Sequence, residues 1–204
     1  MEKPTKKYLE ELIVDAQNKF DNFLYVHSDT TNAEITYVCT KKQNMLGLLS
    51  GFSSLAEMRT RKVKESKTIS KNCKYYNKIY KIDKRVEKIE CFVGGHNDVD
   101  IIYFAFYNGK RRYLFPYFAD LSKAVAYPII VAEFENNNVI EEYRIDGNQI
   151  VYEKYDYSAQ ERIIYYCINF VPAGKYPILG EETGIYNPNT FEYNQTYNHV
   201  WCQE

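Results

Sequence analysis

The chain has 204 residues and a formal net charge of −1, and 45% of its residues are hydrophobic. This length suits one domain that buries a sizeable core, and the hydrophobic content excludes global disorder. No run of 18 apolar residues is present, so we expect no membrane span. The first residues lack the apolar stretch of a signal peptide, so none is expected.

Five cysteines are spread along the chain: Cys39, Cys73, Cys91, Cys167 and Cys202. An odd number at irregular spacing argues against a disulfide framework and against a zinc site. Cys91 and Cys167 lie in apolar runs, where buried reduced thiols are expected. The cysteines therefore predict free thiols, no metal or other cofactor, and a reducing, cytoplasmic compartment.

The first predicted element is an amphipathic helix within residues 1–27. Apolar residues recur at helical spacing and polar residues occupy the opposite face, and Pro4 stands near the first turn. The apolar face consists of Leu9, Leu12, Ile13, Ala16, Phe20, Phe23 and Leu24. We expect this face to pack on a sheet.

Strand patterns begin at residues 33–40, which alternate and are rich in β-branched residues. An insert is expected over residues 41–73, with a short helix starting at Ser54, because Ser54 and Glu57 have capping-box spacing. The following residues fit a hairpin that turns near Asp83-Lys84, although the basic residues there also have helical spacing.

Seven further strands are predicted, at residues 88–93, 99–107, 111–118, 129–134, 139–145, 149–157 and 162–171. Asn108-Gly109 predicts a two-residue type I′ turn, because both residue types accept positive φ. The last four strands are joined by turns so short that neighbouring strands must be antiparallel, as in a meander. Residues 172–204 combine Gly and Pro with many apolar residues, which favours an ordered, irregular segment that wraps over the body.

These elements predict a single α+β domain over residues 1–204. Its N-terminal helix would pack on a mostly antiparallel sheet of seven or eight strands, built from hairpins and a meander. The sheet would occupy residues 33–171, with the insert 41–73, and residues 172–204 would form the wrapping C-terminal segment.

The small net charge hides a strong polarity along the chain. Residues 59–88 contain twelve Lys or Arg and three acids, whereas residues 118–204 contain five Lys or Arg and thirteen acids. Cations with stacking tyrosines between them can follow a phosphate backbone. One alternative function is therefore nucleic-acid binding by residues 59–88, although a solvated lysine-rich face would have the same composition.

No catalytic motif is recognisable, because the chain lacks both a phosphate-binding glycine loop and a nucleophile elbow. His96 precedes two carboxylates, Asp98 and Asp100. A second alternative is a small hydrolase or nuclease that uses His96 with one of these acids. The Gly, Asn and Asp residues around His96 fit a solvated turn better, so we expect a protein that is not an enzyme.

The leading hypothesis rests on the 21 tyrosines and the acidic half of the chain. Alternation gathers acids and tyrosines on the polar faces of the strands between residues 129 and 157. If these faces coincide, they form a rigid patch that attracts a basic protein. The expected partner-binding residues are Glu133, Glu135, Glu141, Tyr143, Glu153, Tyr155 and Tyr157.

The layout as a whole is similar to that of bacterial immunity proteins, in composition and arrangement but without a shared motif. That resemblance implies a non-catalytic protein that neutralises a toxin by covering its active or binding surface.

Overall fold

The structure, a computed structural model, describes residues 4–23, 30–40, 65–69, 71, 73, 75–92, 98–136, 138–147 and 149–158, and the backbone of 163–171, 178–186 and 193–201. The helix expected at Ser54 lies outside these residues. The chain divides into two compact units, which we describe separately. The first consists of Met1–Phe23, Asn108–Arg112 and Pro128–Glu204, and the second of Leu24–Tyr107 and Tyr113–Tyr127.

The N-terminal helix, α1 (Lys6–Asn22), begins where the sequence provides a cap. The Thr5 hydroxyl accepts a hydrogen bond from the Tyr8 backbone N–H at 3.2 Å, which satisfies one of the unpaired donors of the first turn. The buried face consists of Leu9, Leu12, Ile13, Ala16 and Phe20. The predicted apolar face is thereby confirmed, except that Phe23 is half-buried and Leu24 lies outside the described residues.

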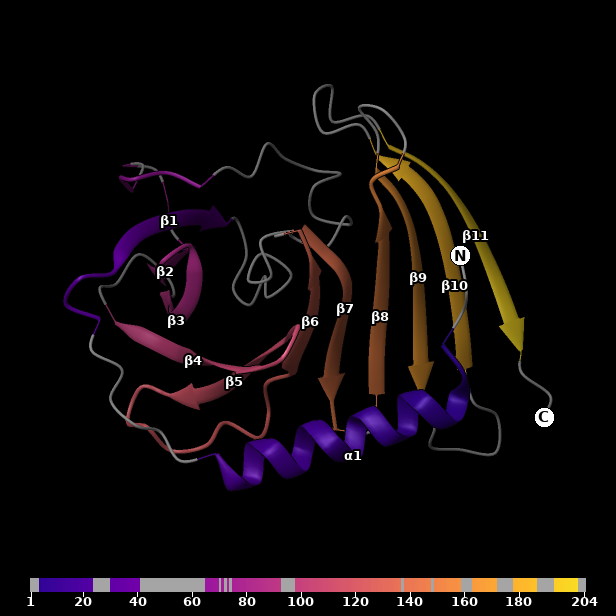
Figure 1. Ribbon diagram of the computed structural model, residues 1–204, viewed down its shortest axis with the longest axis horizontal. Coiled ribbons are helices and arrows are strands. Elements are labelled where there is room, and N and C mark those ends of the chain that lie inside the picture. Colours follow the sequence, from indigo (N-terminus) through magenta and orange to yellow (C-terminus); the bar gives the residue numbers. More distant parts are fainter. Residues whose placement is uncertain are drawn as a thin grey trace. The chain divides into compact units, whose positions relative to one another are not determined.

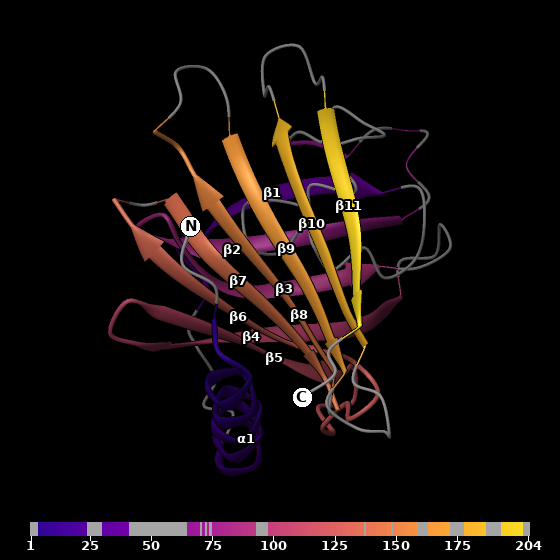
Figure 2. The same ribbon diagram turned by 90° about the vertical axis from the view of Figure 1, so that its right-hand side faces the viewer.

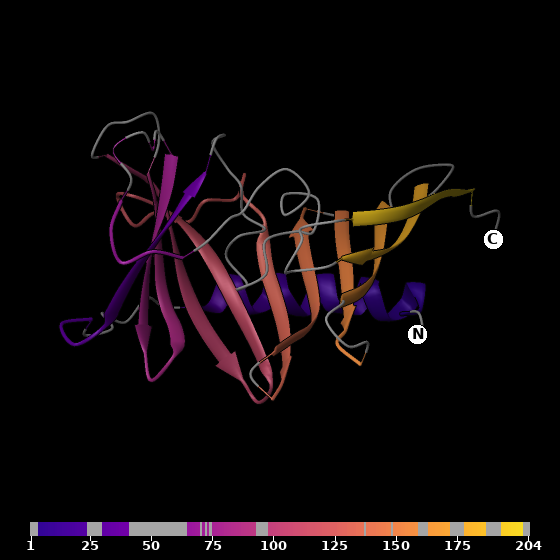
Figure 3. The ribbon, with the colours of Figure 1, turned by 90° about the horizontal axis from the view of Figure 1, so that it is seen from above.

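In the first unit, α1 packs against a run of strands and contacts β6. The strands are β6 (Ile129–Glu135), β7 (Asn138–Asp146), β8 (Gln149–Asp156), β9 (Ile163–Val171), β10 (Ile178–Tyr186) and β11 (Tyr193–Trp201). Each strand pairs antiparallel with the next, so they lie side by side in chain order (Figure 2). The axis of α1 runs across the strands rather than along them (Figures 1 and 3).

The strands β6 to β9 confirm the predicted four-strand meander. Two of their turns contain a residue in the left-handed region, Asn136 with φ 50° and Gly147 with φ 55°. Asn and Gly adopt this conformation more readily than other residues do. Turn chemistry read from the sequence was therefore sufficient to place these strands.

The C-terminal segment differs from the prediction. An irregular wrapping segment was expected over residues 172–204, but this part forms β10 and β11, and the described residues contain eleven strands rather than seven or eight. β10 contains Gly180 and Gly184, which weaken the local strand signal. Pairing with β9 on one side and β11 on the other supplies the hydrogen bonds that a local pattern does not reveal.

The second unit is also built from antiparallel strands. They are β1 (Glu34–Thr40), β2 (Tyr75–Ile82), β3 (Arg85–Phe92), β4 (Val99–Asn108) and most of β5 (Arg111–Phe118). β2 and β3 form the predicted hairpin, and its turn residues Asp83 (φ 50°) and Lys84 (φ 67°) both have positive φ. The basic residues between positions 75 and 88 therefore lie on the two strands or in their turn, and not on a helix.

The connection between β4 and β5 is as short as predicted but lies one residue later. Asn108 ends β4, and the two connecting residues are Gly109 and Lys110. Gly109 has φ 60°, whereas Asn108 does not have positive φ. The predicted type I′ turn at Asn108-Gly109 is therefore wrong in position, because the extended pairing of β4 includes Asn108.

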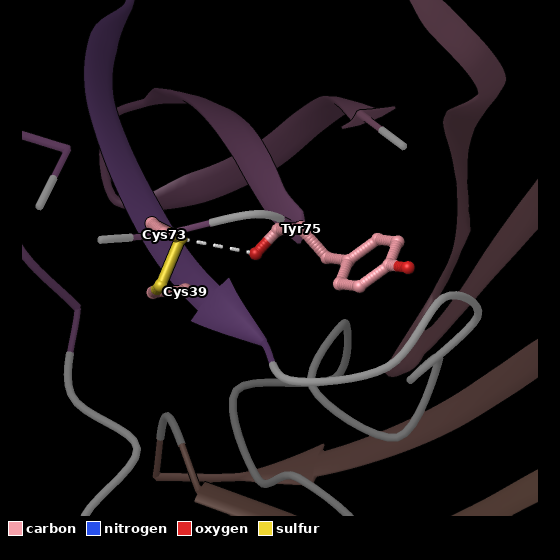
Figure 4. Close-up of a disulfide and its surroundings, with 3 residues drawn as sticks. All are labelled: Cys39, Cys73 and Tyr75. Carbon is pink, nitrogen blue, oxygen red and sulfur yellow. Dashed lines mark hydrogen bonds between the residues drawn. A yellow bond between two sulfur atoms is a disulfide. The ribbon is translucent and has the colours of Figure 1, made fainter. Parts of the chain in front are cut away.

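A disulfide joins Cys39 to Cys73, with their Cα atoms 5.7 Å apart, beside Tyr75 (Figure 4). The expectation of free thiols is wrong for these two residues, and the argument for a reducing compartment loses its basis. Cys39 lies opposite Tyr76 in the β1–β2 pair, so the register brings the residues just before β2 close to Cys39. Local sequence could not show this, since the cysteines are 34 residues apart. Cys91 is free, and burial raises the pKa of its thiol.

No helix among the described residues is both long enough and apolar enough to cross a membrane.

Replacing Phe20 with Ala should lower the free energy of unfolding by about 3–5 kcal/mol, because this ring is a core side chain that is 5% exposed. Val14, which is 56% exposed on the same helix, provides the matched control. Val14→Ala should change stability by less than about 0.5 kcal/mol. Urea unfolding followed by circular dichroism measures both values, and equally small losses would show that α1 is peripheral.

Loss of the disulfide in Cys39→Ser should cost about 2–4 kcal/mol, because the bond restricts a long loop of the unfolded chain. Peptide mapping without reductant should find Cys39 and Cys73 joined. Two separately alkylated peptides from protein purified under oxidising conditions would contradict the pairing.

Candidate functional site

The seven residues expected to bind a partner lie on β6, β7 and β8 or directly after β8. The register places Glu141 opposite Lys154, Tyr143 opposite Tyr152, and Glu142 opposite Glu153. Residues that are directly opposite in an antiparallel pair share a face, and faces alternate along each strand. Glu141 and Tyr143 therefore lie on one face of the sheet, and Glu153 and Tyr155 lie on the other.

Burial separates the seven residues further. Tyr143, Glu153 and Tyr155 are 1%, 4% and 3% exposed. Glu133 is half-buried and pairs with Arg111 at 2.5 Å. Glu135 is exposed. The structure thus does not bring the expected residues together as one open surface.

On the face that carries Glu141, the carboxylate of this residue contacts several hydrogen-bond donors. The Tyr143 hydroxyl donates to Glu141 Oε2 at 2.6 Å, and the Tyr152 hydroxyl donates to Oε1 at 3.3 Å. Lys154 Nζ lies 3.1 Å from the same Oε1. Desolvation raises the pKa of Tyr143, and its hydrogen bond to Glu141 raises it further. Glu141 is therefore held in place as an acceptor by two tyrosine hydroxyls and a lysine.

Tyr8 extends this network into α1. Its hydroxyl accepts a hydrogen bond from Arg111 Nη2 at 2.6 Å, and it lies 3.4 Å from the Tyr143 hydroxyl. Arg111 in turn pairs with Glu133. The helix is therefore joined to β6 and β7 by polar contacts as well as by its apolar face.

The opposite face holds two buried carboxylates side by side. Glu142 is 0% exposed and lies across from Glu153. Arg144 Nη2 donates to Glu153 Oε1 at 2.6 Å, and Arg144 Nε lies 3.9 Å from Glu142 Oε1. The Tyr155 hydroxyl donates to Glu153 Oε2. Burial, followed by the charges of Glu153 and Glu142, raises the pKa of Tyr155.

A hollow of about 460 Å³ lies where β6 ends, β7 begins and β8 ends. Its lining consists of Glu135, Asn136, Asn138, Ile140, Glu141, Lys154, Tyr155, Asp156, Tyr157 and Ser158. Four of the seven expected residues, Glu135, Glu141, Tyr155 and Tyr157, therefore meet here although they do not share a face. The hollow is the candidate binding site.

The lining is acidic and partly aromatic. Glu135, Glu141 and Asp156 outnumber the single cation, Lys154. Hydrogen bonds from the Ser158 side chain and backbone N–H lower the pKa of Asp156, so this carboxylate is ionised at neutral pH. The Tyr157 hydroxyl donates to the Val139 carbonyl at 2.7 Å, which fixes the position of its ring. Such a hollow suits a cationic side chain that can also contact an aromatic ring.

The hydrolase alternative stays a prediction, because its histidine is not among the residues that the structure describes. His96 lies outside the described residues, Asp98 is exposed, and Asp100 accepts a hydrogen bond from the Tyr127 hydroxyl at 3.1 Å. Within the described ranges, no group of three or more His, Cys, Asp or Glu side chains is placed to hold a metal ion.

In the described part of the basic segment, the cations do not form one row. Lys78 and Lys81 are three residues apart on β2, so they lie on opposite faces. Lys88 pairs with Glu90 at 2.8 Å, and Lys81 pairs with Glu65 at 2.5 Å.

Several residues of the polar networks beside the site had no signal in the sequence. Arg111, Arg144 and Glu142 read as ordinary solvated charges in an alternating pattern. Only the cross-strand register shows that Arg144 lies among buried carboxylates.

Comparison of the chain with protein-family models, with curated proteins and with solved structures found no match.

Alkaline pH should destabilise the fold through the buried tyrosines. Desolvation raises the folded-state pKa of Tyr143 and Tyr155 above the unfolded value of about 10. Their contribution to stability is therefore complete below about pH 10 and is lost as the pH rises above it. Ultraviolet titration of folded protein should show a fraction of the 21 tyrosines that ionise only when the chain unfolds. Ionisation of every tyrosine near pH 10 in folded protein would contradict this.

Proposed function

We propose that this protein is a non-catalytic binding protein that docks a basic protein partner at the hollow between β6, β7 and β8. The observation that carries the proposal is the convergence of Glu135, Glu141 and Asp156 with the Tyr157 ring around one opening. A lysine or arginine side chain of the partner would enter the hollow, pair with the carboxylates and contact the ring.

The rigidity and the charge of the hollow support this proposal. The carboxylate of Glu141 and the ring of Tyr157 are fixed by the hydrogen bonds to Tyr143, Tyr152 and Val139. A preorganised site loses little entropy on binding. Residues 118–204 also carry eight more acids than cations, which would steer a basic partner at long range.

An immunity-type role fits this mode of binding. Toxins that act on nucleic acids or lipid head groups have basic active surfaces, and an acidic, rigid hollow would cover a cationic group in such a surface. The protein would then neutralise a toxin by occlusion, without chemistry of its own.

The compartment of this role depends on Cys39 and Cys73. Neutralisation in the cytoplasm requires both thiols to be reduced in the cell, whereas the disulfide fits an oxidising compartment. Alkylation of thiols in acid-quenched cells distinguishes these cases, because only reduced cysteines are labelled.

Among the residues that the structure describes, neither alternative function has a comparable observation. Three lysines of the basic segment, Lys78, Lys81 and Lys88, are each within ion-pair distance of a glutamate. The proposed hydrolase base, His96, lies outside the described residues.

Charge reversal at Glu135 and Asp156, which form the rim of the hollow, should weaken partner binding. We expect Glu135→Lys combined with Asp156→Lys to slow association at least tenfold at low salt, because steering and pairing are both lost. Glu10→Lys combined with Glu11→Lys makes the same change of charge on the exposed face of α1 and is the matched control. Glu153 is unsuitable for this test, because it is buried beside Arg144.

The products of genes that neighbour the gene for this chain are purified, immobilised and tested for binding. Each product is also expressed in cells, to test whether it is toxic and whether co-expression of this protein relieves the toxicity. Rescue by wild-type protein and the control, but not by the rim variant, is expected. Equal association rates for the two variants would exclude the hollow as the binding site. Absence of any toxic or bound product would overturn the immunity role.

A further inference from the structure

The outer edge of β11 is a feature of the first unit that the proposed function does not use. β11 pairs with β10 along nine residues, Tyr193–Trp201, without a register shift. Among the residues that the structure describes, β10 is the one strand paired with it. A strand at an edge presents backbone N–H and C=O groups to which another strand can bind.

β11 lacks the features that usually block pairing at an edge. Its sequence, YNQTYNHVW, contains no Pro, Lys, Arg, Asp or Glu, and natural edge strands use such residues, or bulges, to prevent pairing. The edge strand of the second unit, β1, is covered instead. Tyr37 of β1 exchanges two backbone hydrogen bonds with Ser66, and Cys39 is tied to Cys73. Within the part of the chain that the structure describes, the outer edge of β11 is therefore unpaired, whereas that of β1 is covered.

We infer that β11 pairs antiparallel with β11 of a second copy of this chain and forms a closed dimer. Because β11 carries no acidic residue, Lys or Arg, no register of this pair places such like charges opposite each other. A twofold pair uses the same edge in both copies, so assembly stops at two chains. The main-chain hydrogen bonds of strand addition supply the affinity.

Charge separates this dimer from binding at the hollow. The first unit has a net charge of −6 and the rest of the chain a net charge of +5, so the full chain is close to neutral. Net charge therefore neither drives nor prevents association of two copies. Binding of a basic partner to the acidic hollow weakens as salt is added, so the two associations are distinguishable.

Sedimentation velocity of the full chain over a range of protein and salt concentrations tests the inference. We expect a monomer–dimer equilibrium that persists at high salt. Thr196→Lys combined with Asn198→Lys should raise the dissociation constant at least tenfold, because like charges would face each other across the new pair. Gln149→Lys, at the exposed start of β8, is a control for added positive charge.

A charge-swap mixture separates edge pairing from a folding defect. The Thr196→Lys, Asn198→Lys chain mixed with a Thr196→Glu, Asn198→Glu chain should form a heterodimer, although each alone is monomeric. Wild-type protein that stays monomeric at all concentrations, a lysine variant that dimerises like wild type, or a mixture that does not associate would each overturn the inference. Open-ended oligomers would also overturn it, since a closed pair cannot grow.

Discussion

Hydrogen bonds from tyrosine hydroxyls to carboxylates are the interaction on which the two units depend. A carboxylate inside a sheet is costly unless donors surround it. Tyr143 donates to Glu141 and Tyr155 to Glu153 in the first unit, and Tyr80 donates to Glu90 at 2.8 Å in the second. The ring of each tyrosine fills apolar space while its hydroxyl reaches the acid. Tyrosines in both units therefore stabilise carboxylates inside the fold, a role that composition alone does not show.

This arrangement limits where a partner can bind. Groups such as Glu153 and Tyr155 are occupied with each other and with Arg144, so they support the sheet rather than contact solvent. Two accessible acids, Glu135 and Asp156, lie at strand ends, where the hollow opens. The buried network holds the strands rigid, and the strand ends present the charge. Binding by a small preorganised site is consistent with that division.

Local patterns in the sequence were sufficient to place the helix and most of the strands. They were not sufficient to show which side chains share a face of the sheet. Helical spacing identified the buried side of α1, and turn residues identified the meander and the hairpin at Asp83-Lys84. Whether Glu141 and Glu153 share a face depends on the β7–β8 register, which pairs Glu142 with Glu153. The register shift between Glu133 and Phe134 is likewise invisible to simple alternation. The Cys39–Cys73 bond and the C-terminal strands depend on pairing between distant segments, so single-sequence reasoning did not predict them.

A double-mutant cycle on Tyr155 and Glu153 tests the central role of these hydrogen bonds most directly. The cycle compares the free energies of unfolding of wild type, Tyr155→Phe, Glu153→Gln and the double variant, which isolates the energy of the pair. The structure predicts a favourable coupling of about 1.5–3 kcal/mol, the range for a hydrogen bond to a charged group. A coupling of zero within error, with all four proteins folded, would contradict the account.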